Sequence, residues 1–158
     1  PAADAERWAQ RRGPKTGLRV GLVWSGGYRP DQPALSGLNQ RRNIPLKMLA
    51  PLARSGVTFY SLQKGKEAEA EWRALRDAKW SGPDMVDLMG EVRDFADTAA
   101  IISQLDLVIS VDTSTAHVAG ALGKPVWVLN RHDTCWRWMF DRQDTPWYAS
   151  MQIGRAHV

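Results

Sequence analysis

Apolar runs alternate with amphipathic stretches along most of the chain. Five apolar runs of five to seven residues are typical of strands that are buried on both faces. These strands are predicted at residues 18–24, 57–62, 84–89, 106–111 and 125–129. Helices are predicted from the remaining periodic stretches, at residues 3–12, 45–55, 66–78, 94–105 and 113–122. Strands that alternate with helices predict an α/β fold, a Rossmann-like parallel sheet with helices on both faces.

Local signals add detail to two regions. Asp94 is predicted to cap the helix at 94–105. The buried face of that helix is predicted to carry Phe95, Ala99, Ile102 and Leu105. Residues 25–43 are rich in Gly, Pro, Asn and Arg and predict a long loop, and loops of this length are usually functional or disordered.

Composition narrows the class of protein. The 158 residues carry a net charge of +4, and the pI is about 9.5. The basic residues are dispersed, which favours solubility or a small anionic ligand over nucleic acid. The single cysteine, Cys135, excludes an internal disulfide and indicates a reducing compartment. No apolar run approaches the roughly 18 residues that span a bilayer, and no signal peptide opens the chain, so we expect a cytoplasmic protein without a membrane span.

Polar residues follow three of the predicted strands. The turns are Ser25-Gly26-Gly27, Gln63-Lys64-Gly65 and Asp112-Thr113-Ser114-Thr115. In an open parallel sheet, ligands bind beyond the carboxyl ends of the strands. The last turn begins a helix, where free backbone N–H groups and about half a positive charge attract phosphate. The glycines permit a close approach of the ligand, and Lys64 supplies a cation suited to a diphosphate.

Each of these features also has a purely structural interpretation. Asp112 serves either as the helix N-cap alone or as a ligand for sugar hydroxyls, while the following amides take phosphate. His117, one turn into the helix, faces either the ligand or the core. Arg41 and Arg42 precede a predicted helix, and they form either a phosphate clamp or a solvated pair. Lys64 and the two glycines are either binding residues or plain loop residues.

Several familiar sites are not encoded. No G-x-G-x-x-G follows the first strand and no acid ends the second, which counts against a dinucleotide dehydrogenase. There is no Walker phosphate loop, because Gly123-Lys124 is typical of a helix end. His132 and Cys135 are spaced like two metal ligands but lack a second pair, and nothing supports Cys135 as a nucleophile. The aromatic segment 133–148 either stacks on a base or seals a core or interface.

Five separated motifs together resemble a known family. They are RVGLVWSGG, RRNIPL, FYSLQKG, DFADTAAIISQLDLVISVDTSTAHVAGALGKPVWVL and CWRWMFDRQDTPWY. In this order they are similar to the C-terminal part of tetratricopeptide-repeat-linked, heptosyltransferase-like glycosyltransferases. The resemblance covers residues 18–151 and is specific because of the order of the motifs. It implies the donor-binding lobe of a glycosyltransferase-B fold, which binds a nucleotide sugar.

The resemblance also implies how the chain is divided. Residues 1–16 would be the interlobe helix and linker, and residues 17–151 the donor-binding lobe. The N-terminal lobe, which is absent from this chain, would carry most of the acceptor site and the catalytic base. The loop at 28–40 is longer than in simpler heptosyltransferases. Residues 152–158 contain IGRAHV, which resembles translated sequencing-adapter sequence. We expect them to be a non-native tail, and the predicted fold leaves them out.

The resemblance places a set of residues at the donor. They are Ser25, Gly26, Gly27, Arg42, Gln63, Lys64, Asp112, Thr113, Ser114, Thr115 and His117. No metal or other cofactor is implied, because the helix dipole and basic side chains would offset the charge on the leaving nucleoside diphosphate. The chain is thus predicted to be the donor-binding half of a glycosyltransferase with an unknown acceptor, inactive without its other lobe. The alternatives are a sugar-nucleotide epimerase lobe and a non-catalytic scaffold lobe.

Overall fold

The computed structural model describes residues 2–12, 15–27 and 36–155, which form an α/β fold around one parallel sheet. Six strands of the described residues pair in the order β3-β2-β1-β4-β5-β6. The strands are β1 Leu18–Val23, β2 Val57–Ser61, β3 Met85–Asp87, β4 Leu107–Val111, β5 Val126–Asn130 and β6 Met151–Arg155. All neighbouring strands are parallel. The predicted fold class and the five predicted strands are confirmed.

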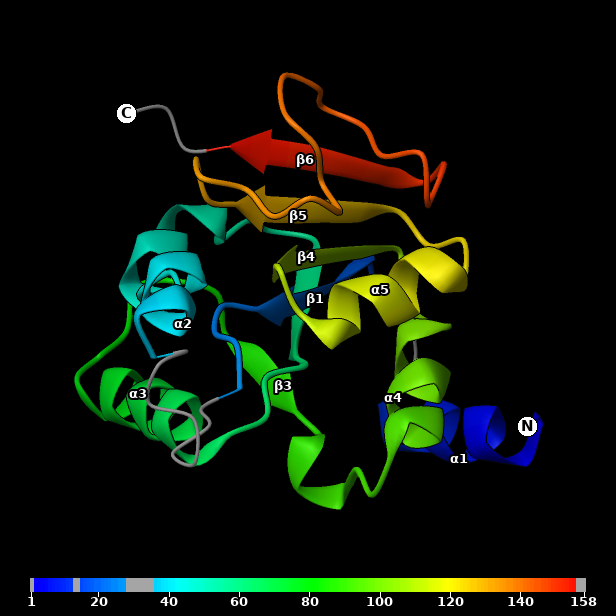
Figure 1. Ribbon diagram of the computed structural model, residues 1–158. Coiled ribbons are helices and arrows are strands. Elements are labelled where there is room, and N and C mark those ends of the chain that lie inside the picture. Colours follow the sequence, from blue (N-terminus) through cyan, green and yellow to red (C-terminus); the bar gives the residue numbers. More distant parts are fainter. Residues whose placement is uncertain (1, 13–14, 28–35, 156–158) are drawn as a thin grey trace.

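Helices cover both faces of the sheet (Figure 1). One face carries α1 (Ala2–Arg12), α4 (Phe95–Ile102) and α5 (Ser114–Ala121). The other face carries α2 (Ser36–Arg42), the 3-10 helix η2 (Leu46–Leu52) and α3 (Lys66–Asp77). A short 3-10 helix, η3 (Met89–Glu91), follows β3. The helices are needed because parallel strands require long crossover connections.

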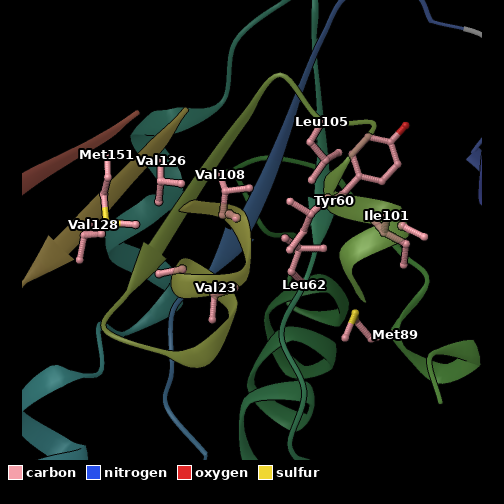
Figure 2. Close-up of a cluster of buried hydrophobic side chains, with 14 of the residues drawn as sticks. Val23, Tyr60, Leu62, Met89, Ile101, Leu105, Val108, Val126, Val128 and Met151 are labelled. Carbon is pink, nitrogen blue, oxygen red and sulfur yellow. The ribbon is translucent and has the colours of Figure 1, made fainter. Parts of the chain in front are cut away.

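The strands divide their side chains between two cores. Val108 and Val126 are fully buried in the larger cluster, which Ile101 of α4 joins (Figure 2). Trp8 of α1 and Ala116 of α5 belong to the same cluster. Leu22 and Ile109 face the opposite side, where they join Trp72 of α3 in the second cluster. Successive residues of a strand point to opposite faces, so continuous apolar runs supply both cores at once.

The region between β1 and β2 differs from its prediction. The sequence predicts an uninterrupted loop at residues 25–43, but residues 36–42 form α2. Two arginines in its last turn suit the negative end of the helix dipole. Residues 28–35 of the predicted loop lie outside the described residues. The predicted α-helix at residues 45–55 is the shorter 3-10 helix η2, since Pro51 lies inside it and has no N–H to donate.

Helix α4 confirms one detail of its prediction and corrects another. Asp94 is the N-cap, and its carboxylate accepts a hydrogen bond of 3.0 Å from the backbone N–H of Asp97. The prediction that Phe95 belongs to the buried face is wrong, because its side chain is 61% exposed. Asp97 instead turns inward, 1% exposed, where Arg7 and Trp8 of α1 bind it. This polar contact sets the rotation of α4, and an apolar pattern alone does not reveal it.

The structure adds a sixth strand that the sequence does not predict, in the segment expected to be a non-native tail. Residues 151–155 form β6, which pairs with β5 from Val126↔Met151 to Asn130↔Arg155. Met151 and Ile153 are buried in the larger core, whereas Gln152 between them is exposed. This alternation is that of a strand with one buried face. Residues 156–158 lie outside the described residues.

Candidate functional site

The strand order reverses between β1 and β4, the place where open α/β sheets bind ligands. The two strands are paired in parallel up to Val23↔Ser110, so their carboxyl ends lie next to each other. Residues 25–27 continue from β1, and residues 112–115 continue from β4 into α5. The fold therefore brings two of the predicted turns together at this edge of the sheet.

Gln63 shapes the first of these turns from the end of β2. Its side chain is 2% exposed. Its Oε1 atom accepts hydrogen bonds from the backbone N–H groups of Trp24 (3.1 Å) and Ser25 (2.9 Å). Its Nε2 atom donates to the carbonyls of Ser25 (3.0 Å) and Lys64 (3.1 Å). Both ends of the amide are thus used by the backbone, and Gln63 fixes the path of residues 24–25.

Arg42 joins the two turns. Its Nη1 atom donates to the Asp112 carbonyl at 3.2 Å, and its guanidinium lies against Gly26 so closely that a Cβ there would overlap it. Asn43, which the sequence analysis does not single out, accepts a hydrogen bond of 2.8 Å from the Gly26 N–H. The Nε atom of Arg42 is buried and has no hydrogen-bond partner among the described residues. The site thus holds a half-buried cation between its two turns.

The helix that starts after β4 has no side-chain cap, although one interpretation of the sequence makes Asp112 its N-cap. The N-cap residue of α5 is Thr113, and its side chain makes no capping hydrogen bond. The interpretation of Asp112 as an N-cap alone is therefore wrong. The Thr113 hydroxyl instead lies 3.0 Å from the Ser110 hydroxyl. Ser114 is exposed and Thr115 is buried, so the first turn of α5 has one hydroxyl toward solvent and one toward the protein.

The Asp112 carboxylate meets the segment that follows β5. Its Oδ2 atom accepts a weak hydrogen bond from the Cys135 thiol, with Sγ and Oδ2 3.6 Å apart. The Arg137 guanidinium in turn donates to Cys135 Sγ at 3.5 Å. Cys135 therefore links an acid and a base that are 25 positions apart in sequence, 112 and 137. Sequence reasoning misses this pair because the contact exists only after β5 and the following segment have folded back.

His117 is held by aromatic rings from the same segment. Its ring stacks on Trp138, with centroids 5.0 Å apart and planes at 15°. Its Nδ1 atom lies 3.2 Å from the Tyr148 hydroxyl. Burial lowers the pKa of the His117 imidazole, the Asp112 carboxylate opposes this shift, and the Arg137 charge adds to it. The imidazole is half-buried and hydrogen-bonded, which agrees with the interpretation of His117 as a core residue. His117 lies within the first two turns of α5, the helix that starts at the site.

Two predicted cations lie away from these contacts. The Lys64 ammonium donates to the Val92 carbonyl at 2.5 Å. This contact lies on the β2–β3 side of the sheet, beyond the carboxyl ends of the strands. Arg41 forms an exposed ion pair with Asp133, with Nη1 and Oδ2 2.9 Å apart. Exposed pairs of this kind contribute little to stability. The structure thus gathers Ser25, Gly26, Arg42, Gln63 and Asp112 into one network, while Lys64 stands at its border.

The segment 131–150 contains the functional candidates that sequence reasoning left undecided. Trp138 is fully buried and seals the larger core. Trp136 and Trp147 are 70% and 53% exposed. The two interpretations of this aromatic segment therefore apply to different residues. The spacing of the tryptophans does not tell the buried ring from the exposed rings. The segment has no regular helix or strand, so no sequence period indicates which side chains face the core.

Comparison with known proteins places the fold in a family. The model of glycosyltransferase family 9, the heptosyltransferases, matches residues 48–140, from η2 to the aromatic segment. The chain belongs to glycosyltransferase family 9. The match includes Gln63 and the whole turn from Asp112 to His117. It therefore covers the carboxyl ends of β2, β4 and β5, whereas Ser25, Gly26 and Arg42 of the network come before the matched residues.

Solved structures of family 9 share this fold. Over 99% of its length, the chain resembles 44% of the E. coli ADP-heptose lipopolysaccharide heptosyltransferase II, with a TM-score of 0.65 and 15% identity. It resembles 40% of a family 9 glycosyltransferase from Veillonella parvula, with a TM-score of 0.62 and 14% identity. The family 9 domain thus has the fold of one lobe of these proteins and spans less than half of each.

A curated relative extends over nearly the whole chain. Protein FlbA of Caulobacter vibrioides is 29% identical over an alignment 157 residues long, which covers 96% of this chain and 24% of FlbA. The chain thus spans about a quarter of the length of this relative.

A hollow among the described residues lies away from the network. It has a volume of about 1000 Å³ and is bounded by β5, β6 and residues 140–144. Trp127 and Phe140 line it, and none of the predicted donor residues does. Its position on the side of the last two strands, away from the β1–β4 switch point, argues against it as the donor site.

Two further properties concern the described residues as a whole. Residues 2–12, 15–27 and 36–155 contain no group of three His, Cys, Asp or Glu side chains that is placed to hold a metal ion. Within the same ranges, every helix is too short or too polar to traverse a lipid bilayer.

Proposed function

We propose that this family 9 domain is the donor-binding half of a heptosyltransferase-like glycosyltransferase that uses a nucleoside-diphosphate sugar. The observation that carries the proposal is the turn from Asp112 to Thr115, an uncapped helix start at the β1–β4 switch point. The N–H groups of such a turn attract phosphate through hydrogen bonds and the helix dipole. The Arg42 guanidinium, bound to the Asp112 carbonyl, adds a full positive charge beside it.

The same arrangement suits the chemistry of sugar transfer. When the bond between the sugar and the diphosphate breaks, negative charge develops on the leaving nucleoside diphosphate. Helix amides and a preorganised guanidinium stabilise this charge without having to reorganise during the reaction. The buried Nε–H of Arg42 supports this role, because buried donors are nearly always hydrogen-bonded and a phosphate oxygen would supply the acceptor.

The rest of the reaction is assigned to sequence outside this domain. The domain spans less than half of the solved family 9 structures and about a quarter of its curated relative. We propose that the acceptor site and the catalytic base lie in the remainder, a lobe preceded by tetratricopeptide repeats, and that the domain alone binds donor but transfers no sugar. We keep the cytoplasm as the proposed compartment, on the ground of the single cysteine.

Thermal unfolding against a panel of ADP, GDP, UDP and CDP and their sugars tests the proposal. One nucleoside diphosphate at 100 times its dissociation constant should stabilise the domain by about 2.7 kcal/mol. The shift should persist in EDTA. Asp112→Ala should remove the additional shift that the matching nucleotide sugar produces, because the carboxylate is proposed to bind sugar hydroxyls of the donor, and the exposed Asp133→Ala is the matched control. A cooperative melt that no member of the panel shifts would contradict donor binding and favour a scaffold lobe.

A further inference from the structure

Two large exposed aromatic rings belong to the segment that contacts the proposed donor site through Cys135. Trp136 is 70% exposed and Trp147 is 53% exposed. Their ring centroids are 6.2 Å apart with an interplanar angle of 90°, so the rings meet edge to face. Single exposed apolar residues are common on protein surfaces. A fixed pair of exposed indoles beside a ligand-binding turn is a more specific feature, because aromatic rings there offer flat faces to a ligand.

Arg137 holds the pair in place. Its backbone carbonyl accepts a hydrogen bond of 2.9 Å from the Trp147 indole N–H. Its guanidinium lies over the Trp136 ring, 5.1 Å from the centroid, in a cation–π contact. The three side chains thus form one unit, which we name the indole platform (Trp136, Arg137 and Trp147). Because the geometry exists without ligand, less conformational entropy is lost on binding.

The indole platform is continuous with the turn after β4. The Arg137 guanidinium donates to Cys135 Sγ at 3.5 Å, and that thiol donates to the Asp112 carboxylate at 3.6 Å. The Arg137 charge also acts on His117, where it helps to lower the pKa of the imidazole. Arg137 therefore connects the indole platform to the Asp112 turn through Cys135, and both indoles of the platform are exposed.

We propose that the indole platform binds the nucleoside diphosphate part of the donor, with an indole stacked on the base and Arg137 on a phosphate oxygen. This inference rests on the proposed function. Every nucleobase has a π-face that stacks on an aromatic ring, and guanidinium groups bind phosphate oxygens through paired N–H donors. A neutral sugar would use the rings but not the charge. The pairing of ring and cation on one unit favours a nucleotide.

Isothermal titration of the chain with a nucleoside diphosphate from the panel, and with inorganic pyrophosphate, tests the platform. Trp136→Ala should weaken nucleoside diphosphate binding roughly tenfold, within the range for loss of one base–aromatic stack, and leave pyrophosphate binding unchanged. Trp136→Phe should retain most of the affinity because it keeps an aromatic face. Arg137→Gln should weaken both ligands. Trp127→Ala is the matched control, since Trp127 is an exposed tryptophan of β5 that lines the hollow between β5, β6 and residues 140–144.

The outcomes separate the two proposals. If Trp136→Ala and Arg137→Gln bind nucleoside diphosphate like Trp127→Ala, while Arg42→Ala does not bind it, the platform is not part of the site and the donor-binding function stands. Equal losses for pyrophosphate and nucleotide in Trp136→Ala would mean that the ring acts structurally, which also overturns the inference. If the unmodified chain binds no nucleoside diphosphate, both proposals fail.

Discussion

At the scale of single residues, the site is held in shape by three side chains that bind backbone groups. Gln63 ties together residues 24 and 25, Asn43 holds the Gly26 N–H, and Arg42 reaches the Asp112 carbonyl. Gly26 is required because the Arg42 guanidinium occupies the space that a Cβ would take. The neighbouring Gly27 meets nothing within 4 Å at the same position. The two glycines of one turn thus have different physical roles.

Gly26→Ala should therefore destabilise the protein by about 1–3 kcal/mol, the usual cost of overpacking, or displace Arg42 and weaken nucleotide binding. Gly27→Ala should be close to neutral. Urea unfolding of Gly26→Ala, Arg42→Ala and the double variant measures the coupling, because removing the Arg42 side chain should relieve the added methyl group. Strictly additive losses in the double variant would show that the two residues do not share this space.

At the scale of elements, a buried carboxylate joins α1 to α4. Asp97 binds the Arg93 side chain (Nε to Oδ2, 3.1 Å) and backbone N–H (3.0 Å) and also Arg7 and the Trp8 indole (3.1 Å). The pKa of the Asp97 carboxyl lies far below its ordinary value, mainly because of the hydrogen bonds from Arg93. Burial acts in the opposite direction and raises the pKa. The proposed interlobe helix α1 is thus docked on the lobe through a charge as well as through Trp8, which is 2% exposed.

The depressed pKa of Asp97 predicts how stability depends on pH. The unfolded chain binds a proton at this carboxyl near pH 4, whereas the folded chain does so only at lower pH. The stabilisation is therefore fully present above about pH 4 and is lost as the pH falls through the folded pKa. Asp97→Asn should lower the melting temperature at pH 7 and flatten its fall below pH 4. Asp84→Asn, on an exposed aspartate, is the control, and an equally steep fall in both variants would count against the prediction.

At the scale of the whole molecule, β6 completes the sheet and brings the last segments onto the core. Met151 is 2% exposed, and it lies with Tyr148 against Gly120 of α5. Tyr148 in turn reaches His117. The strand at residues 151–155 therefore anchors both the sheet edge and the aromatic residues that surround His117.

Met151→Ala should lower the free energy of unfolding by about 2–5 kcal/mol, as large-to-small substitutions in cores do. Gln152→Ala, one position along on the exposed face of the same strand, should be close to neutral. Thermal or urea unfolding followed by far-UV circular dichroism compares the two. If residues 151–155 were an appendage to the fold, both substitutions would have the same small effect.

The sequence by itself determined the α/β class, five strands and the position of the Asp112 turn at a strand end. These features follow from local patterns, because apolar runs, helical periodicity and polar turn residues are properties of neighbouring positions. The tertiary structure alone decided that Asp97 turns α4 inward, that Arg42 joins two turns, and that Cys135 and Arg137 reach Asp112. It also decided that 151–155 is a strand and which tryptophans are exposed. Each of these depends on contacts between distant segments, and only the folded chain sets the distances and burial that determine their energies.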